Sequence, residues 1–229
     1  MKKSAAAMGV AIAAISLGVG LVGCGSHSKS TATSSSTSTS STTTTTKPTT
    51  STSAQASGPN QTIADYIKQN GIQETMIKHD TPGAPTIDLP VPDGWKQLPE
   101  SADAPYGGIV FNAPTDPNDP PKIIAIVEKL TGNVDTDKLL AVAPGEVKNL
   151  QGYDGGDGDK STLSGFPAYQ LGGDYTKDGA QRVVAQKTVV IQGKDGLYVL
   201  QLNAEGPQPD KTPLMDATTV IDDKTTITP

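Results

Sequence analysis

Apolar residues recur along the chain in two patterns, which predict helices and strands. Where they recur every three to four residues they predict helices, the first of which is capped by Thr62 and closed by Gly71. Where they alternate with polar residues or run together they predict strands. The predicted helices cover residues 63–70, 137–143 and 213–222, and the predicted strands cover residues 74–78, 86–91, 95–98, 108–112, 122–130, 167–176, 181–191 and 197–203.

Turn residues indicate how the last strands pair. Asp178-Gly179 and Asp195-Gly196 supply the positive φ angles of tight hairpins, so the last three predicted strands are antiparallel. The strand over residues 122–130 is apolar on both sides, which requires cover on both faces of the sheet. The pattern therefore predicts an α+β fold, an α/β/α sandwich with a central antiparallel sheet.

The start of the chain has the pattern of an export signal. Lys2 and Lys3 precede an apolar run from residue 5 to 22, whose length is near the lower limit for a membrane-spanning helix. The run ends in Leu21-Val22-Gly23-Cys24, which resembles the bacterial lipobox, where the cysteine is acylated and the bond before it is cut. We therefore expect a signal peptide over residues 1–23 and a lipid on Cys24 that holds the exported protein on the outer face of the cell membrane. The alternative is an uncleaved signal anchor with an incidental cysteine.

A tract of serine and threonine follows the cysteine. Between Ser28 and Ser53, 22 of 26 residues are Ser or Thr, and no hydrophobic period is present. Such a composition predicts a disordered stalk over residues 24–59. The hydroxyl groups are equally compatible with O-linked sugars and with a bare linker.

Residues 60–229 are long enough for a single globular domain. This part contains all 24 acidic residues and 14 of the 18 basic ones, which leaves a net charge of −10. An acidic domain argues against nucleic acid as a partner and against docking of the domain on anionic lipid heads. Because no cysteine follows Cys24, disulfide and thiolate chemistry are excluded from the domain.

The residues predict a protein that is not an enzyme and that needs no metal or cofactor. The single histidine of the domain, His79, leads into a Pro-Gly turn and is expected in an exposed loop. No strand is followed by a nucleophile elbow, a zinc helix or a phosphate-binding loop. A glycosidase, which needs only two carboxylates, remains the enzymatic alternative, although no spacing selects a pair.

The acidic segment over residues 154–160 suggests calcium but departs from the EF-hand pattern. With Asp157 in the first position, Thr162 stands where the glycine belongs and Ala168 where the bidentate glutamate belongs. We interpret the segment as a solvated acidic loop.

Aromatic side chains provide the remaining candidates for a site. The predicted strand ends and loops contain Trp95, Tyr106, Tyr153 and Tyr175, which can line a ligand cleft there. The default interpretation of these side chains is packing in or beside the core. The candidate ligand or partner surface is Trp95, Tyr106, Gly107, Gly108 and Tyr153.

Six segments carry a resemblance to a known family: residues 62–67 (TIADYI), 86–92 (TIDLPVP), 105–110 (PYGGIV), 116–121 (DPNDPP), 185–191 (AQKTVVI) and 225–229 (TTITP). Together with the lipobox and the stalk, they make the chain resemble the mycobacterial LpqN/LpqT lipoprotein family. The family is similar to Mog1/PsbP-like domains, which implies an α/β/α sandwich and a binding or assembly module without shared catalytic residues.

The resemblance implies a cell-envelope lipoprotein that assists the transport of trehalose mycolates with an RND-type exporter. The alternative from another functional class is a surface-exposed or shed protein that binds a host protein. A carrier predicts an apolar cavity between the sheet and the helices, whereas an interaction module predicts a filled core and an exposed apolar patch.

Overall fold

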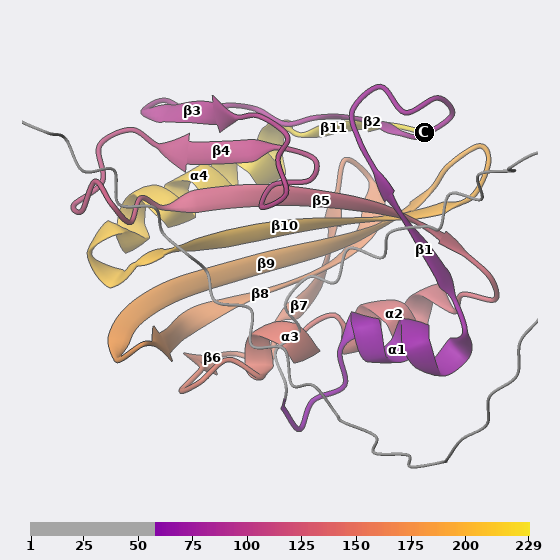
Figure 1. Cartoon of the computed structure of the whole chain (residues 1–229), viewed down its shortest axis with the longest axis horizontal. Helices are drawn as coiled ribbons and strands as arrows, with labels where there is room; N and C mark the ends of the chain where they lie inside the picture. The colour runs from indigo at the N-terminus through magenta and orange to yellow at the C-terminus, as the bar shows by residue number, and fades with distance from the viewer. Residues whose placement is uncertain (1–57) are drawn as a thin grey trace, which may run out of the picture. The chain divides into compact units, whose positions relative to one another are not determined.

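The computed structural model describes residues 58–229, and their fold is organised around one large antiparallel sheet (Figure 1). The predicted signal peptide, the lipid site at Cys24 and the stalk up to residue 57 lie outside the described residues. Within the described part, the longest helix has 14 residues and none is long and apolar enough to cross a membrane.

Seven strands of the sheet follow the order β3-β4-β5-β10-β9-β8-β6, while β1 pairs with β5 and β7 pairs with β8. All of these pairs are antiparallel. The strands are β1 (Gln73–Ile77), β3 (Trp95–Leu98), β4 (Gly108–Phe111), β5 (Lys122–Thr131), β6 (Asp154–Gly155), β7 (Asp159–Leu163), β8 (Phe166–Lys177), β9 (Ala180–Gln192) and β10 (Leu197–Pro207). A separate two-stranded sheet joins β2 (Thr86–Asp88) to β11 (Thr226–Thr228).

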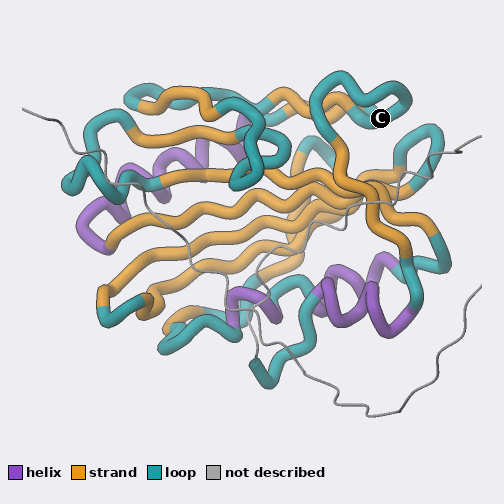
Figure 2. Tube along the Cα trace, viewed as in Figure 1, coloured by secondary structure: helices purple, strands orange, loops and turns teal. Residues whose placement is uncertain are grey.

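The helices have clear local causes. Helix α1 (Ile63–Asn70) begins with a capping box, in which Thr62 accepts from the Asp65 amide and Asp65 accepts from the Thr62 amide. It ends at Gly71, whose φ of 62° suits a residue without Cβ. The others are α2 (Thr136–Val142), α3 (Gly145–Lys148), a short 3-10 turn (Gln208–Asp210) and α4 (Lys211–Lys224), and Figure 2 shows them gathered in two places around the strands.

Two apolar cores lie on opposite faces of the sheet. On one face, Leu214, Ala217 and Ile221 of α4 pack into a cluster that includes Val127 and Val189. On the other face, α1 and α2 pack over a second cluster, which contains sheet residues such as Val190 and Val199. Successive residues of a strand point to opposite faces, so Val189 packs in the core under α4 and Val190 packs in the core under α1 and α2.

Most predicted elements are present, and the mixed α+β character with a large antiparallel sheet is confirmed. Helix α1 and strand β3 have the predicted bounds, and both predicted hairpin turns join neighbouring strands. The sequence interpretation missed β6, β7 and β11, and the segment over residues 154–160 is not simply a loop, since β6 and β7 occupy its two ends. These short polar strands exist because longer strands or β2 offer them partners.

The close approach of β4 and β5 predicts a strict requirement for glycine at position 108. A Cβ on Gly108 would lie 2.2 Å from the carbonyl oxygen of Ile123, so Gly108→Ala should lower the free energy of unfolding by about 3 kcal/mol. Urea denaturation followed by circular dichroism measures this. Gly156→Ala is the matched control, because the nearest atom to its Cβ is 3.9 Å away. Equal stability of the two variants would contradict the prediction.

Candidate ligand-binding groove

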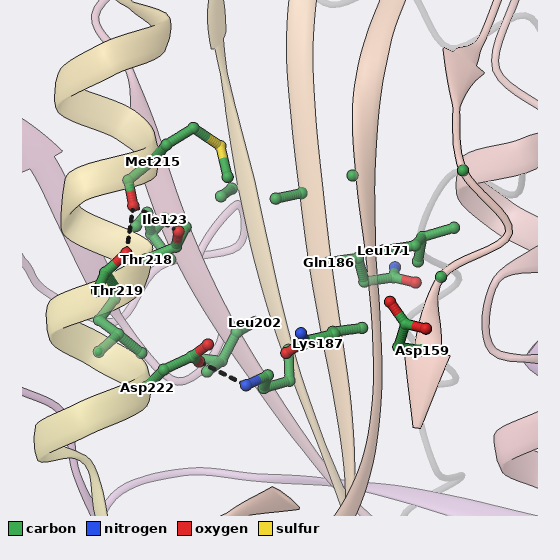
Figure 3. A pocket seen from close by; sticks show the side chains of 17 residues that line it. Ile123, Asp159, Leu171, Gln186, Lys187, Leu202, Met215, Thr218, Thr219 and Asp222 are labelled. Atoms are coloured by element: carbon green, nitrogen blue, oxygen red, sulfur yellow. Dashed lines mark hydrogen bonds and ion pairs between the residues drawn. The ribbon is translucent and has the colours of Figure 1, made fainter. Parts of the chain in front are cut away.

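A groove of about 410 Å³ lies between α4 and strands β8 to β10, on the α4 face of the sheet (Figure 3). We call it the α4 groove. One wall is helical and carries Met215, Thr218, Thr219 and Asp222, while Asp159 of β7 stands on the far side. Among the described helices, only α4 packs on this face of the sheet. Part of the surface of β8 and β9 therefore stays uncovered.

Small residues make the middle of the groove floor. Gly172 of β8 pairs with Ala185 of β9, which pairs with Ala204 of β10, so the three stand side by side across the sheet. All three line the groove. Since none has a side chain beyond Cβ, the floor is low and apolar here, and the groove owes its depth to this row.

The neighbouring row is polar on β7, β8 and β9 and ends in the apolar Leu202 on β10. Asp159, Gln170 and Lys187 are register partners on β7, β8 and β9, and all three line the groove. The Lys187 ammonium lies 2.7 Å from the Asp222 carboxylate of α4, and only 9% of the Lys187 side chain is exposed. Figure 3 shows this ion pair bridging the sheet and the helix. A charge this deeply buried is stable only when it is paired.

A second ion pair joins the other end of α4 to the sheet. Lys211, the first residue of the helix, lies 3.0 Å from Asp174 of β8. Asp174 stands one row beyond Gly172 on the same face, since residues two apart in a strand share a face. The small-residue row therefore lies between two ion pairs.

The structure separates the residues that the sequence grouped as a candidate surface. Trp95 packs against Phe111 with ring centroids 5.4 Å apart and lines a different pocket of about 330 Å³ on the other side of α4. Tyr106 is 2% exposed and stacks on His79, whose exposed position in a loop is confirmed. Tyr153 donates hydrogen bonds to the carbonyls of Gly156 and Gly172, both of which line the α4 groove.

The backbone requires glycine at positions 107 and 108. Gly107 has a φ of 75°, and a Cβ there would lie 2.9 Å from the Leu98 carbonyl oxygen. The segment that contains them is buried against β3 and β5. A ligand role for these glycines, for Trp95 and for Tyr106 stays a prediction from the sequence.

The sequence interpretation missed the residues that shape the α4 groove. The signal that could have found them is the polar trio Gln186-Lys187-Thr188, which stands between two apolar stretches of β9 and of which each residue is at most 7% exposed. Polar residues in a buried strand cost stability unless they have partners. For Lys187 the partner is Asp222, and the sequence pattern alone does not connect these two positions.

Carboxylates also gather on the opposite face of the sheet. Burial, and after it the charge of Glu74, raises the pKa of Glu128 to about 8, and burial also raises the pKa values of Glu74 and Glu146. Within residues 58–229 no group of three His, Cys, Asp or Glu side chains has the arrangement of a metal site. Glu128 and Glu146 are half-buried and Glu74 is exposed, so these acids form a pH-sensitive polar cluster at the edge of this face.

The raised pKa of Glu128 predicts how stability depends on pH. Between about pH 4.5 and 8 the unfolded chain releases this proton and the folded chain keeps it, so the free energy of unfolding falls as pH rises. Glu128→Gln should remove this slope and raise stability at pH 7 by about 2 kcal/mol. Urea denaturation across this range tests it, with the exposed Asp103→Asn as control. An unchanged slope in Glu128→Gln would count against a Glu128 that stays protonated in the folded protein.

Comparison with known proteins identifies the family. Residues 59–228 match the family model described as "Probable lipoprotein LpqN". Lipoprotein LpqN of Mycobacterium tuberculosis (strain ATCC 25618 / H37Rv) is 61% identical over 176 residues, which cover 76% of this chain and 77% of that protein. A crystal structure of LpqN involved in cell envelope biogenesis of Mycobacterium tuberculosis, 61% identical, has a TM-score of 0.74 and covers 75% of this chain and 100% of that chain. The resemblance found in the sequence is thus confirmed, and the chain belongs to the LpqN lipoprotein family.

Proposed function

We propose that this protein is a lipid-anchored, non-enzymatic binding module of the cell envelope that holds an envelope lipid in the α4 groove. In this role it acts as an accessory in trehalose mycolate transport with an RND-type exporter. The observation that carries the proposal is the groove itself, an open space of about 410 Å³ between the sheet and a helix, floored by Gly172, Ala185 and Ala204.

The distribution of apolar surface supports a carrier over a protein-docking module. Among residues 58–229, the exposed large hydrophobic side chains are Val91 and Met215, and Met215 belongs to the groove wall. A protein-docking face of the kind expected for host binding would present a broad apolar patch. An apolar groove between sheet and helix is the feature expected of a carrier.

The chemistry of the groove supports binding without catalysis. Its lining contains no histidine or cysteine, and its one lysine is paired with Asp222. The carboxylates with raised pKa values, which would be the natural candidates for general acids, lie on the opposite face of the sheet. Nothing in the groove therefore pairs a nucleophile with a base.

The family relationship supports the place of action. The relative of known structure is a protein involved in cell envelope biogenesis, and a lipobox at Cys24 would anchor this chain on the outer face of the membrane that borders the envelope. The helices on both faces of an antiparallel sheet support a Mog1/PsbP-like sandwich, a fold that does not by itself specify a function.

The proposal predicts two kinds of lipid on the protein. Native mass spectrometry of the mature protein, isolated from its own envelope, should show acyl mass on Cys24 and a separately bound, non-covalent lipid. A Cys24→Ala form, exported with an ordinary cleavable signal, should lose the first and keep the second. If neither the native form nor the Cys24→Ala form carries a non-covalent lipid, the result would favour a protein-binding module. Absence of acyl mass, with residues 1–23 still attached, would refute the lipoprotein assignment.

A further inference from the structure

Carboxylates without a balancing cation gather on the sheet face opposite the α4 groove. Glu74 of β1 hydrogen-bonds to Glu128 of β5, and the charge of Glu146 of α3 also acts on Glu128. Among residues 58–229 the structure records no ion pair for any of these three acids. Burial, and after it the charges of Glu74 and Asp65, raises the pKa of Glu146. Acids that act on one another in this way, with no cation beside them, attract a cation from solution.

Two buried oxygens beside Glu146 lack partners. The Gln186 side chain of β9 is 6% exposed, and its amide nitrogen donates to Glu146 at 3.3 Å and to Asn203 at 2.9 Å. Both N–H groups are thereby used, which fixes the orientation of the amide. The Gln186 Oε1 atom and the hydroxyl of the fully buried Thr188, two residues further on the same face, have no partner among residues 58–229. Such atoms are rare in folded proteins and indicate a bound water or ion.

The unpartnered oxygens and the Glu146 carboxylate belong to one polar patch. Thr188 pairs in register with Gln201 of β10, and Gln186 pairs with Asn203, the next β10 residue on this face. Gln201 also hydrogen-bonds to Glu146. Glu146 of α3 therefore lies over two adjacent rows of polar side chains. We call these five residues the α3 patch.

The chemistry of the α3 patch selects a hard cation. A water molecule would satisfy Gln186 Oε1, but only a cation would also compensate the acids. The oxygens come from carboxylate, amide and hydroxyl groups, and neither histidine nor cysteine is among the five residues, which favours Ca²⁺ or Mg²⁺ over zinc or copper. Flexible side chains with neutral oxygens suit the variable coordination of Ca²⁺ better than the strict octahedron of Mg²⁺. With so few carboxylates, and no group of three among residues 58–229, the site would be weak.

We propose that the α3 patch binds one Ca²⁺ ion through the Glu146 carboxylate, Gln186 Oε1 and the Thr188 hydroxyl, with waters completing the coordination. The ion would join α3 to β9. Because Asn149 at the end of α3 holds Asn60, it would also stabilise the place where the chain enters the described fold. The site lies on the face of the sheet opposite the α4 groove, so it is independent of the proposed carrier function.

Calorimetric titration with CaCl₂ tests the inference on the full mature chain carrying Cys24→Ala, after metal is removed with EDTA. Physiological salt screens unspecific attraction to a domain of net charge −10. One Ca²⁺ per chain should bind with a Kd of about 0.1–1 mM, the range of extracellular calcium modules. Glu146→Gln keeps the shape of the side chain, removes its charge and should weaken binding about tenfold or more. The matched control is Glu100→Gln, the same change at a carboxylate that accepts from the His79 amide outside the α3 patch, and it should leave the affinity unchanged.

A second pair of variants separates the α3 patch from the rest of the acidic surface. Gln186→Met removes the unpartnered oxygen and should also weaken Ca²⁺ binding, whereas Asp159→Asn, in the acidic segment over residues 154–160, should not. Circular dichroism of each metal-free variant confirms that it is folded, and Glu146→Gln decides alone if Gln186→Met is not.

Three results would overturn the proposal. If the wild-type chain binds no Ca²⁺, the unpartnered oxygens hold a water molecule. If Asp159→Asn removes binding and Glu146→Gln keeps it, the ion lies in the acidic segment. If MgCl₂ binds as tightly as CaCl₂, the selection of calcium is wrong.

Discussion

The docking of α4 on the antiparallel sheet is the interaction on which the candidate site depends. Leu214, Ala217 and Ile221 form a single narrow stripe and bury it in the larger core, so the helix attaches firmly but covers only part of the sheet. Burial of such side chains contributes about 1.5–3 kcal/mol each for the larger ones. The part of β8 and β9 that α4 leaves open becomes the groove. A broader apolar stripe would have drawn the helix across the strands and filled that space.

The register of the strands decides what the groove presents. Residues two apart in a strand share a face, and Ala185 and Val189 of β9 face α4. Lys187, which stands between them, therefore faces α4 as well. A shift of β9 by one residue would turn Gln186 and Thr188 towards α4 and leave Asp222 without its cation. Pairing of β9 with both β8 and β10 over most of its length makes such a slip costly. The extensive sheet thus holds the groove-lining residues in place.

Local signals predicted the elements whose causes are local. The capping box of α1 and the Asp-Gly hairpin turns lie within a few residues of what they control, and these elements appear where they were expected. Strands β6, β7 and β11 were missed because short polar segments become strands only beside a partner supplied by the fold. The aromatic candidates show the same limit. Trp95 and Tyr106 are buried by residues distant in the sequence, and the groove residues Lys187 and Asp222 meet only after α4 docks.

The groove also has a structural connection to the place where the chain enters the described fold. Asn60 is held by Asn149, whose side chain accepts from the Asn60 backbone amide and donates to its carbonyl. The adjacent Lys148 lies 2.7 Å from Asp157, in the connection between β6 and β7 that contributes Gly156 and Gly158 to the groove. The entry of the chain and the rim of the groove are therefore neighbours.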